Sequence, residues 1–505
     1  MLLQADKLKI TLLRNGRVLI EDFSFTLKQG DKIAVIGEEG DGKSTLMKVL
    51  CGERGVLSYA AYSGTLVRTG RSAYFPQFLP EEKCGKTLYE YFADADVYAH
   101  YGVLREMDLC EDMLFSARTL ASLSGGERVK ARLFRLLCDD PDALFLDEPS
   151  NDLDADSLEF LCGFIRTCPV PVVFISHDET LLRRAANGVI HIEQLIKKTK
   201  SKVSVSRMGF EEYLSRREEG IARQTQIALN ERTEYRKKRE TLARLAETAR
   251  KNTSWKNRDG IPSSDGHAKR FMQAAAAKIK RLERERENMT GLPDREKSIV
   301  ARFEEDVALP RGKRILDFSV ERLTAGEKVL ARRVALSLVG GEHVGITGKN
   351  GAGKSTLLRQ IEGALRDKGD LRVVSMPQNY ADALDFSLTP SEYLQAHYDK
   401  TTQTKAFTLL GNLNFTPEEM RARIGELSGG QQAKLIFLNM VLQKANVLVL
   451  DEPTRNFSPL SAPAVRSALR AFGGAIVSVS HDRLFLEEVC GSVYKLDGNG
   501  LRRLR

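Results

Sequence analysis

The sequence lacks the features that mark membrane, secreted and metal-binding proteins. No stretch approaches the roughly 20 apolar residues that a membrane-spanning helix needs, and the opening Met-Leu-Leu-Gln-Ala-Asp lacks the basic-then-apolar order of a secretory signal. The seven cysteines form no Cys-x-x-Cys pair and no metal-ligand cluster, which favours reduced, packed thiols. These absences predict a cytoplasmic protein with no membrane partner.

What is present is one set of short motifs that occurs twice in the same order. Three of them return after the same 304 residues: Ser124 of Leu-Ser-Gly-Gly as Ser428, Asp147-Glu148 as Asp451-Glu452, and His177 of Ser-His-Asp as His481. Such fixed-period similarity indicates duplication of a whole domain. With 505 residues, 42% of them hydrophobic, the chain can build a core in each copy.

Each copy begins with a glycine-rich turn that follows an apolar strand and ends in Lys-Ser-Thr. In such a turn the backbone N–H groups approach phosphates, the lysine reaches the β and γ phosphates, and the serine hydroxyl ligates Mg²⁺. The candidate residues are Gly37, Gly40, Gly42, Lys43, Ser44 and Thr45 in the first turn, and Gly348, Gly351, Gly353, Lys354, Ser355 and Thr356 in the second. By itself this motif indicates only a phosphate-binding NTPase.

Each copy also carries an apolar run that ends in an acidic pair. The run Ala-Leu-Phe-Leu predicts a buried strand that delivers Asp147 to the metal region, and Val-Leu-Val-Leu does the same for Asp451. The following carboxylates, Glu148 and Glu452, can polarise a water for in-line attack on the γ phosphate. They are therefore the candidate catalytic bases.

The formal net charge of +9 is concentrated between the two copies. Residues 232–281 hold fifteen Lys and Arg against five Asp and Glu. An excess of this kind is typical of contact with nucleic acid or another anionic surface. A solvated helical face is the alternative interpretation.

The same region has the spacing of two packed helices. Apolar residues recur every seven positions from Leu214 to Leu242, and again at spacings of three and four from Ala268 to Met289. This pattern predicts an antiparallel helical hairpin, with one helix over 211–250 and a turn over 260–266. The single tryptophan, Trp255, lies beside that turn among basic residues, placed either to stack on a partner or to close the hairpin.

The position of Leu-Ser-Gly-Gly, 23 residues before each strand-end Asp, resembles the ATP-binding cassette (ABC) ATPases. In that family the Leu-Ser-Gly-Gly signature motif caps ATP held by the opposite cassette, so two cassettes sandwich two nucleotides head to tail. The resemblance implies intramolecular pairing in a monomer. Ser428, Gly429 and Gly430 would complete the site of Lys43, and Ser124, Gly125 and Gly126 that of Lys354.

The resemblance also assigns roles to two further pairs of residues. Gln77 and Gln378 match the family's metal- and water-sensing glutamine, and His177 and His481 match its γ-phosphate-contacting histidine. The implied cofactors are ATP and Mg²⁺. The implied Mg²⁺ ligands are Ser44, Gln77 and Asp147 in one site, and Ser355, Gln378 and Asp451 in the other.

The order cassette, basic helical linker, cassette resembles the ABC-F subfamily, whose members act on ribosomes. The expected fold is α/β, with two tandem ABC-type P-loop ATPase domains (1–200 and 311–505) joined by an antiparallel α-helical hairpin linker (201–310). The resemblance implies that linker residues 232–281 contact rRNA and the P-site tRNA near the peptidyl-transferase centre. Arg-Asn-Phe-Ser-Pro at 455–459 looks like the antibiotic-resistance branch, which protects ribosomes from lincosamides, streptogramins A and pleuromutilins.

Three features depart from the general ABC pattern. The loop after the first strand has no aromatic residue to stack on adenine, so GTP use stays open. Ser458 stands where the first copy has Asp154, which predicts that the two sites are not equivalent. Gln77 and Ser124 are 47 residues apart and Gln378 and Ser428 are 50 apart, which leaves no room for the helical arm of housekeeping members.

Three other functions stay open as alternatives. A general translation-regulating ABC-F factor would share every feature above. A transporter ATPase subunit would explain the cassettes alone, because it needs no basic helical spacer. A DNA-repair or chromosome-organising ATPase would place its coiled coil inside a single cassette, or would carry zinc-binding cysteines.

Overall fold

The computed structural model describes residues 2–151, 153–195, 199–258, 273–274, 277–278, 280–284, 286, 289–291, 293, 303, 308–413 and 415–505. The chain divides into two compact units. One contains Met1–Phe210 with Glu296–Arg505, and the other is Glu211–Arg295. The boundaries 1–200, 201–310 and 311–505 expected for the domains stay predictions.

The first cassette is built on a six-stranded sheet. Its order is β5 (Ser72–Phe75), β6 (Ala143–Asp147), β7 (Val172–Ile175), β3 (Lys32–Ile36), β8 (Gly188–Gln194) and β9 (Lys200–Ser206). All neighbours are parallel except β8 and β9. Strands β3, β6 and β7 are buried at every position, which explains their nearly continuous apolar sequences.

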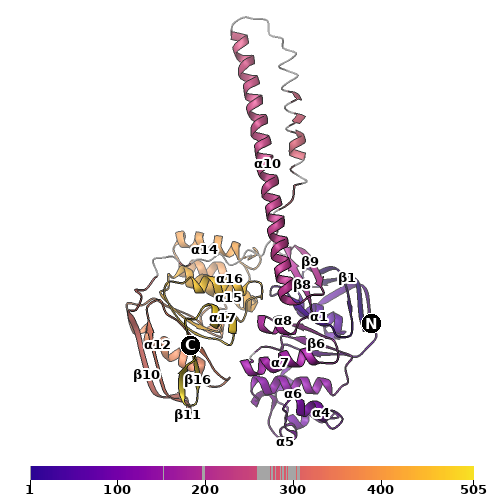
Figure 1. Ribbon diagram of the computed structural model, residues 1–505, viewed down its shortest axis with the longest axis vertical. Coiled ribbons are helices and arrows are strands. Elements are labelled where there is room, and N and C mark those ends of the chain that lie inside the picture. Colours follow the sequence, from indigo (N-terminus) through magenta and orange to yellow (C-terminus); the bar gives the residue numbers. More distant parts are fainter. Residues whose placement is uncertain are drawn as a thin grey trace. The chain divides into compact units, whose positions relative to one another are not determined.

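A smaller antiparallel sheet and a set of helices complete this cassette (Figure 1). The sheet has the order β2 (Val18–Leu27), β1 (Leu3–Leu12) and β4 (Ala60–Arg68). The α-helices are α1 (Lys43–Cys51), α2 (Glu81–Cys84), α3 (Leu88–Phe92), α4 (Tyr101–Glu106), α5 (Glu111–Leu114), α6 (Gly125–Leu137), α7 (Ala155–Thr167) and α8 (Glu179–Ala185), and the 3₁₀ turns are η1 (Arg54–Ser58) and η2 (Leu120–Ser122).

The second cassette repeats the six-stranded sheet in the same order. Its strands are β13 (Val373–Met376), β14 (Val447–Asp451), β15 (Ala475–Val479), β12 (His343–Thr347), β16 (Ser492–Asp497) and β17 (Gly500–Arg503). Its helices are α12 (Lys354–Arg366), η4 (Tyr380–Asp382), α13 (Pro390–His397), α14 (Lys400–Asn412), η5 (Ile424–Glu426), α15 (Gly429–Leu442), α16 (Ala462–Arg470) and α17 (Arg483–Glu488). The expected duplication and α/β fold class are confirmed.

The copies differ in the antiparallel sheet. In the second cassette β10 (Arg314–Ala325) pairs with β11 (Lys328–Val339), and residues 308–413 hold no counterpart of β4. The sequence shows the same difference, because Gln77 follows Lys43 by 34 residues whereas Gln378 follows Lys354 by 24. The missing residues are those that form β4 in the first cassette.

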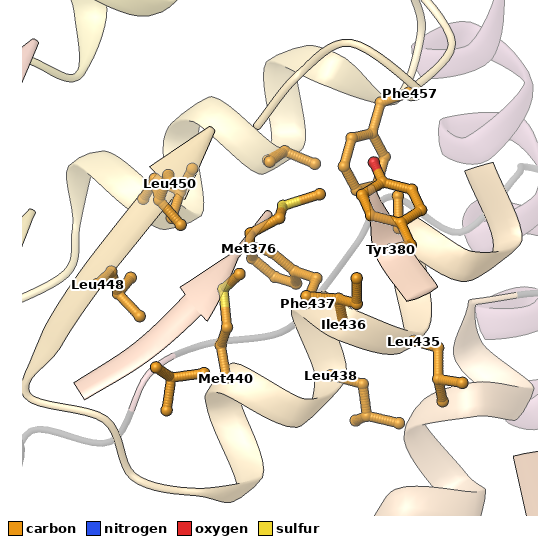
Figure 2. Packing of buried hydrophobic residues seen from close by; sticks show 14 of the residues in the cluster. Met376, Tyr380, Leu435, Ile436, Phe437, Leu438, Met440, Leu448, Leu450 and Phe457 are labelled. Atoms are coloured by element: carbon orange, nitrogen blue, oxygen red, sulfur yellow. The ribbon is translucent and has the colours of Figure 1, made fainter. Parts of the chain in front are cut away.

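Each cassette has its own apolar core. In the second, β13 and β14 pack on α15, with Met376, Phe437 and Leu450 buried at the centre (Figure 2). In the first, Leu46 and Leu50 of α1 pack against Ile33 and Val35 of β3. These cores fix the strands whose carboxyl ends carry the motif residues.

The unit Glu211–Arg295 is dominated by α10 (Phe210–Arg258), a helix of 49 residues and about 70 Å (Figure 1). It runs past residue 250, the expected end, because no glycine or proline interrupts the sequence before Gly260. Gln224 donates to the carbonyl of Gly291, and Glu231 accepts from Thr290, so the returning segment runs antiparallel to α10. The turn predicted at 260–266 lies outside the described residues.

Within this unit the sequence pattern matches the burial. Ala228 is fully buried, and Ile221, Tyr235 and Leu242, which share its spacing of seven, are partly buried among exposed neighbours. Among the described residues, no helix is long and apolar enough to cross a membrane.

Candidate nucleotide sites

The sheet brings together motifs that are far apart in the sequence. In the first cassette the glycine-rich loop of residues 37–45, here called P-loop 1, follows β3, and Gln77, Glu148 and His177 follow β5, β6 and β7. The carboxyl ends of parallel strands meet at one edge of a sheet, where α/β proteins bind ligands. The second cassette places residues 348–356, here called P-loop 2, with Gln378, Glu452 and His481 in the same way.

Both P-loops need glycine for their shape. Gly37 and Gly348 have φ of 151° and 152°, and a Cβ there would lie 2.5 Å from the Ile192 carbonyl oxygen and 2.4 Å from that of Leu496. Gly42 and Gly353, with φ of 94° and 95°, directly precede α1 and α12. Gly40 and Gly351 also have positive φ, 79° and 76°, in open space. The loops thus leave backbone N–H groups at the helix starts for phosphate oxygens.

The P-loop lysines lie over these cradles. Lys43 Nζ donates to the carbonyl oxygens of Gly37 and Glu38, both at 2.9 Å. Lys354 Nζ donates to Gly348 at 2.8 Å and to Lys349 at 3.0 Å. Both lysines are buried, as is Thr45, whereas Thr356 is half-buried. Each ammonium is therefore held where a phosphate in the cradle would meet it.

The expected metal-side groups lie together in both sites. The Ser44 hydroxyl is 3.1 Å from Asp147 Oδ1, and the Tyr74 hydroxyl donates to Oδ2 at 2.7 Å. Burial raises the pKa of Asp451, and a hydrogen bond from Ser355 opposes that rise. Hydroxyl and carboxylate oxygens are ligands that Mg²⁺ prefers, so these pairs fit that ion. Gln77 and Gln378 stand exposed just beyond β5 and β13.

Glu148 is a buried carboxylate at a strained backbone position. Its φ is 49°, and that of Glu452 is 54°, values that favour glycine and cluster at functional sites. The Glu148 carboxylate accepts the His177 backbone N–H at 3.3 Å, and Oε1 lies 3.1 Å from His177 Nε2. Oε1 has no hydrogen-bond partner with good geometry among the described residues. This orphaned oxygen fits a water or substrate proton.

The second site has a looser version of this pair. The Glu452 carboxylate accepts from the Ser480 hydroxyl and the His481 N–H, both at 3.3 Å, whereas His481 Nε2 is 3.9 Å from Oε1. Burial raises the pKa of Glu148 to about 8 and that of Glu452 to about 7. Burial also lowers the pKa of His177 to about 3 and that of His481 to about 4, so both histidines are neutral.

The signature serines start helices. Ser124 caps α6 and Ser428 caps α15, each through a capping box with the side chain three residues later. Gly125 and Gly429 open these helices, and the second glycines need their small size. A Cβ on Gly126 would lie 2.1 Å from Ser157 Oγ, and one on Gly430 would lie 2.8 Å from the Asn456 carbonyl oxygen.

The second signature motif meets P-loop 1. The Gly430 backbone N–H donates to the Glu39 carboxylate, and Lys434 Nζ on α15 lies 2.9 Å from Glu38 Oε2. Arg466 of α16 also pairs with Glu179 of α8 at 2.6 Å, and both side chains are buried. The head-to-tail arrangement implied for Lys43 and the second signature motif is thus present in the contacts.

Two nucleotide-binding folds with paired motif sets define a tandem P-loop ATPase. The protein-family model described as "ABC transporter" matches residues 20–151 and 331–455, which is just over half of the chain. The chain therefore belongs to the ATP-binding cassette family and is an ATP-hydrolysing enzyme.

Relatives with the same double-cassette length include ribosome-associated ABC-F proteins. "Ribosome protection protein VmlR" of Bacillus subtilis (strain 168) is 29% identical over 95% of this chain and 84% of its own length. "Energy-dependent translational throttle protein EttA" of Escherichia coli (strain K12) is 27% identical over 96% of this chain and 90% of its own.

The fold has a counterpart among solved structures. A chain from the crystal structure of archaeal ribosomal stalk protein aP1 with the archaeal ribosome recycling factor aABCE1 aligns with a TM-score of 0.61, covering 98% of this chain and 89% of that one. Sequence identity is 18%, so this likeness concerns the fold.

Sequence reasoning missed several residues at these sites. Tyr74, Lys434 and Ser461 carry no recognised motif, although the 304-residue offset relates Lys434 to Lys130 and Ser461 to Ser157. At the loop that lacks an adenine-stacking aromatic, Arg17 donates to the carbonyl of Gly40 in P-loop 1. The repeat spacing could have identified two of these residues, but Tyr74 only through its place at the end of β5.

Proposed function

We propose that this protein is a ribosome-binding ABC-F ATPase that protects ribosomes from lincosamide-, streptogramin A- or pleuromutilin-type antibiotics. The observation that carries the proposal is the exposed basic surface of the helical unit between two complete cassettes. Arg232 and residues 236–239 on α10 are exposed, as are Lys278, Lys280 and Arg281 on the returning segment. Sequence-independent affinity for RNA comes from such Lys and Arg side chains.

A groove on this unit adds shape to the charge. Its volume is about 410 Å³, and its lining combines an apolar floor of Leu242 and Leu282 with basic walls of Lys237, Lys238, Lys278 and Arg281. A phosphate backbone following the groove would meet four positive groups. This supports contact with rRNA or the P-site tRNA through residues 232–281. The names of the two relatives, which refer to ribosome protection and translation, favour the same partner.

The two sites would drive engagement and release. We infer that Lys43 and Lys354 bind the phosphates of ATP, and that Ser44 with Asp147, and Ser355 with Asp451, hold Mg²⁺, which when bound neutralises charge on the β and γ phosphates. Gln77 and Gln378 would complete these ligand sets. Glu148 and Glu452 take the proton of the attacking water, and neutral His177 and His481 orient that carboxylate and contact the γ phosphate.

Co-sedimentation tests the partner. A Glu148→Gln/Glu452→Gln protein with ATP should pellet with ribosomes, and wild type with ADP should do so less. Duplex DNA and lipid vesicles serve as controls that separate the repair and transport alternatives. Binding to vesicles or DNA instead of ribosomes would overturn the proposal.

Drug susceptibility tests the finer function. Expression in a susceptible Gram-positive host should raise the inhibitory concentration of at least one of the three drug classes. If no class is affected while ribosome binding persists, the general translation-regulating alternative replaces antibiotic protection. The relative named as a translational throttle is the observation that favours this second function.

A further inference from the structure

P-loop 1 is acidic where P-loop 2 is not. It reads Gly-Glu-Glu-Gly-Asp-Gly-Lys-Ser-Thr, whereas P-loop 2 reads Gly-Lys-Asn-Gly-Ala-Gly-Lys-Ser-Thr. Glu38, Glu39 and Asp41 therefore stand opposite Lys349, Asn350 and Ala352 in the duplicated pattern. A loop that binds a polyanion gains nothing from three carboxylates, so these residues need another explanation.

Glu38 makes a set of polar contacts with the second cassette. Its carboxylate accepts from Ser458, accepts from Ser461 Oγ at 2.6 Å, and pairs with Lys434 Nζ at 2.9 Å. Both partners of the ion pair are largely shielded from solvent, with side-chain exposures of 13% and 14%. Burial raises the pKa of Glu38, but Lys434 and the two hydroxyls outweigh it and hold that pKa well below its usual range.

Glu39 occupies a donor at the start of the second signature helix. Its carboxylate accepts the backbone N–H of Gly430, the second residue of α15. A Cβ on Gly430 would lie 3.2 Å from this carboxylate, so the approach is close. The N–H groups in the first turn of a helix are those that bind phosphate, and here one of them holds a side-chain carboxylate.

The opposite interface has the reverse charge pattern. There the P-loop residue is Lys349, and the residue matching Ser458 is Asp154. Burial raises the pKa of Asp154, but hydrogen bonds from Ser157 and the charges of His481 and Lys349 lower it overall. Thus Glu38 with Ser458 in one site replaces Lys349 with Asp154 in the other. The departure at Ser458 is matched by a change in the facing P-loop, because an Asp at 458 would repel Glu38.

We propose that Glu38 and Glu39 set the nucleotide affinity of the Lys43 site by standing in for nucleotide phosphates on the second signature motif and the 458–461 segment. Nucleotide that enters this site displaces the two carboxylates from Gly430, Lys434, Ser458 and Ser461. The Lys354 site has no such carboxylate in its P-loop. It therefore binds nucleotide more tightly and fills first. This inference rests on the ATPase fold alone and is independent of any ribosomal role.

A binding measurement on single-site proteins tests the proposal. Lys354→Ala leaves the Lys43 site as the only complete one, and magnesium AMP-PNP, titrated calorimetrically, reports its affinity without hydrolysis. Glu39→Gln in this background should raise that affinity on the order of tenfold, because the charge-assisted bond to Gly430 is lost and repulsion of phosphate falls. Glu39→Asn, which copies Asn350, should act in the same direction.

Two controls separate this effect from general charge removal or misfolding. Glu106→Gln removes an exposed carboxylate of α4 and should leave the affinity unchanged. In a Lys43→Ala background, Glu39→Gln should not change the affinity of the remaining Lys354 site. The nucleotide-free Glu38→Gln/Glu39→Gln protein should melt at a lower apparent temperature than wild type, and AMP-PNP should restore it. An unchanged or weakened affinity in the Glu39 variants would overturn the proposal.

Discussion

The pKa values of the two buried glutamates predict how ATP hydrolysis depends on pH. A general base acts only in its ionised form, and a raised pKa delays ionisation to higher pH. With a pKa of about 8, Glu148 is about one tenth ionised at pH 7, whereas Glu452, with a pKa of about 7, is about half ionised. Activity should therefore rise with pH, and more steeply in the first site.

Single-site variants isolate the two contributions. Glu452→Gln leaves Glu148 as the only base, so kcat/KM should increase roughly tenfold between pH 7 and pH 9. Glu148→Gln leaves Glu452, and the increase over the same interval should be about twofold. Because kcat/KM reports the ionisation of free enzyme, it is the parameter that matches the nucleotide-free structure.

The double variant sets the baseline. Glu148→Gln/Glu452→Gln keeps the size of both side chains at their positive-φ positions, so the fold should persist while the rate falls about 10² to 10⁴-fold. Steady-state phosphate release from pH 6 to 9, with circular dichroism at each pH, supplies the measurement. A flat profile in both single variants, or wild-type turnover in the double variant, would refute the assignment of these carboxylates as bases.

Three further predictions concern other parts of the chain. Changing the four basic residues of 236–239 to Gln should weaken ribosome binding and flatten its log-log salt slope by about 0.7 to 0.9 per lost contact, with Arg216→Gln, already paired to Glu212, as control; an unaltered slope would indicate a solvated face. Arg466→Met leaves buried Glu179 without its cation, so it should destabilise nucleotide-free protein by about 3 to 5 kcal/mol in denaturant unfolding, with Arg366→Met as surface control; a loss under about 1 kcal/mol contradicts this. Trp255→Ala, near the end of α10, should change drug protection in susceptibility assays while ATP turnover persists, and reduced turnover would count against a separate role for the tip.

Much of the architecture could be read from the sequence because its signals are local or periodic. The glycine pattern before Lys43 and Lys354 requires a particular backbone shape, and the apolar runs before Asp147 and Asp451 require buried strands. The constant 304-residue offset then determines two copies of one fold. Seven-residue spacing along α10 predicted the helix and its less exposed face, although not its continuation to Arg258, since helix ends are weakly marked without a breaker.

Tertiary structure alone decided which side chains complete each site. Glu38 and Ser461 are 423 residues apart, and Glu39 and Gly430 are 391 apart, so no local pattern couples them. The sequence by itself shows an acidic P-loop and a serine in place of an aspartate as two unrelated departures. Only the folded chain shows that they face each other, because head-to-tail contact of the cassettes places one beside the other and charge repulsion requires them to change together.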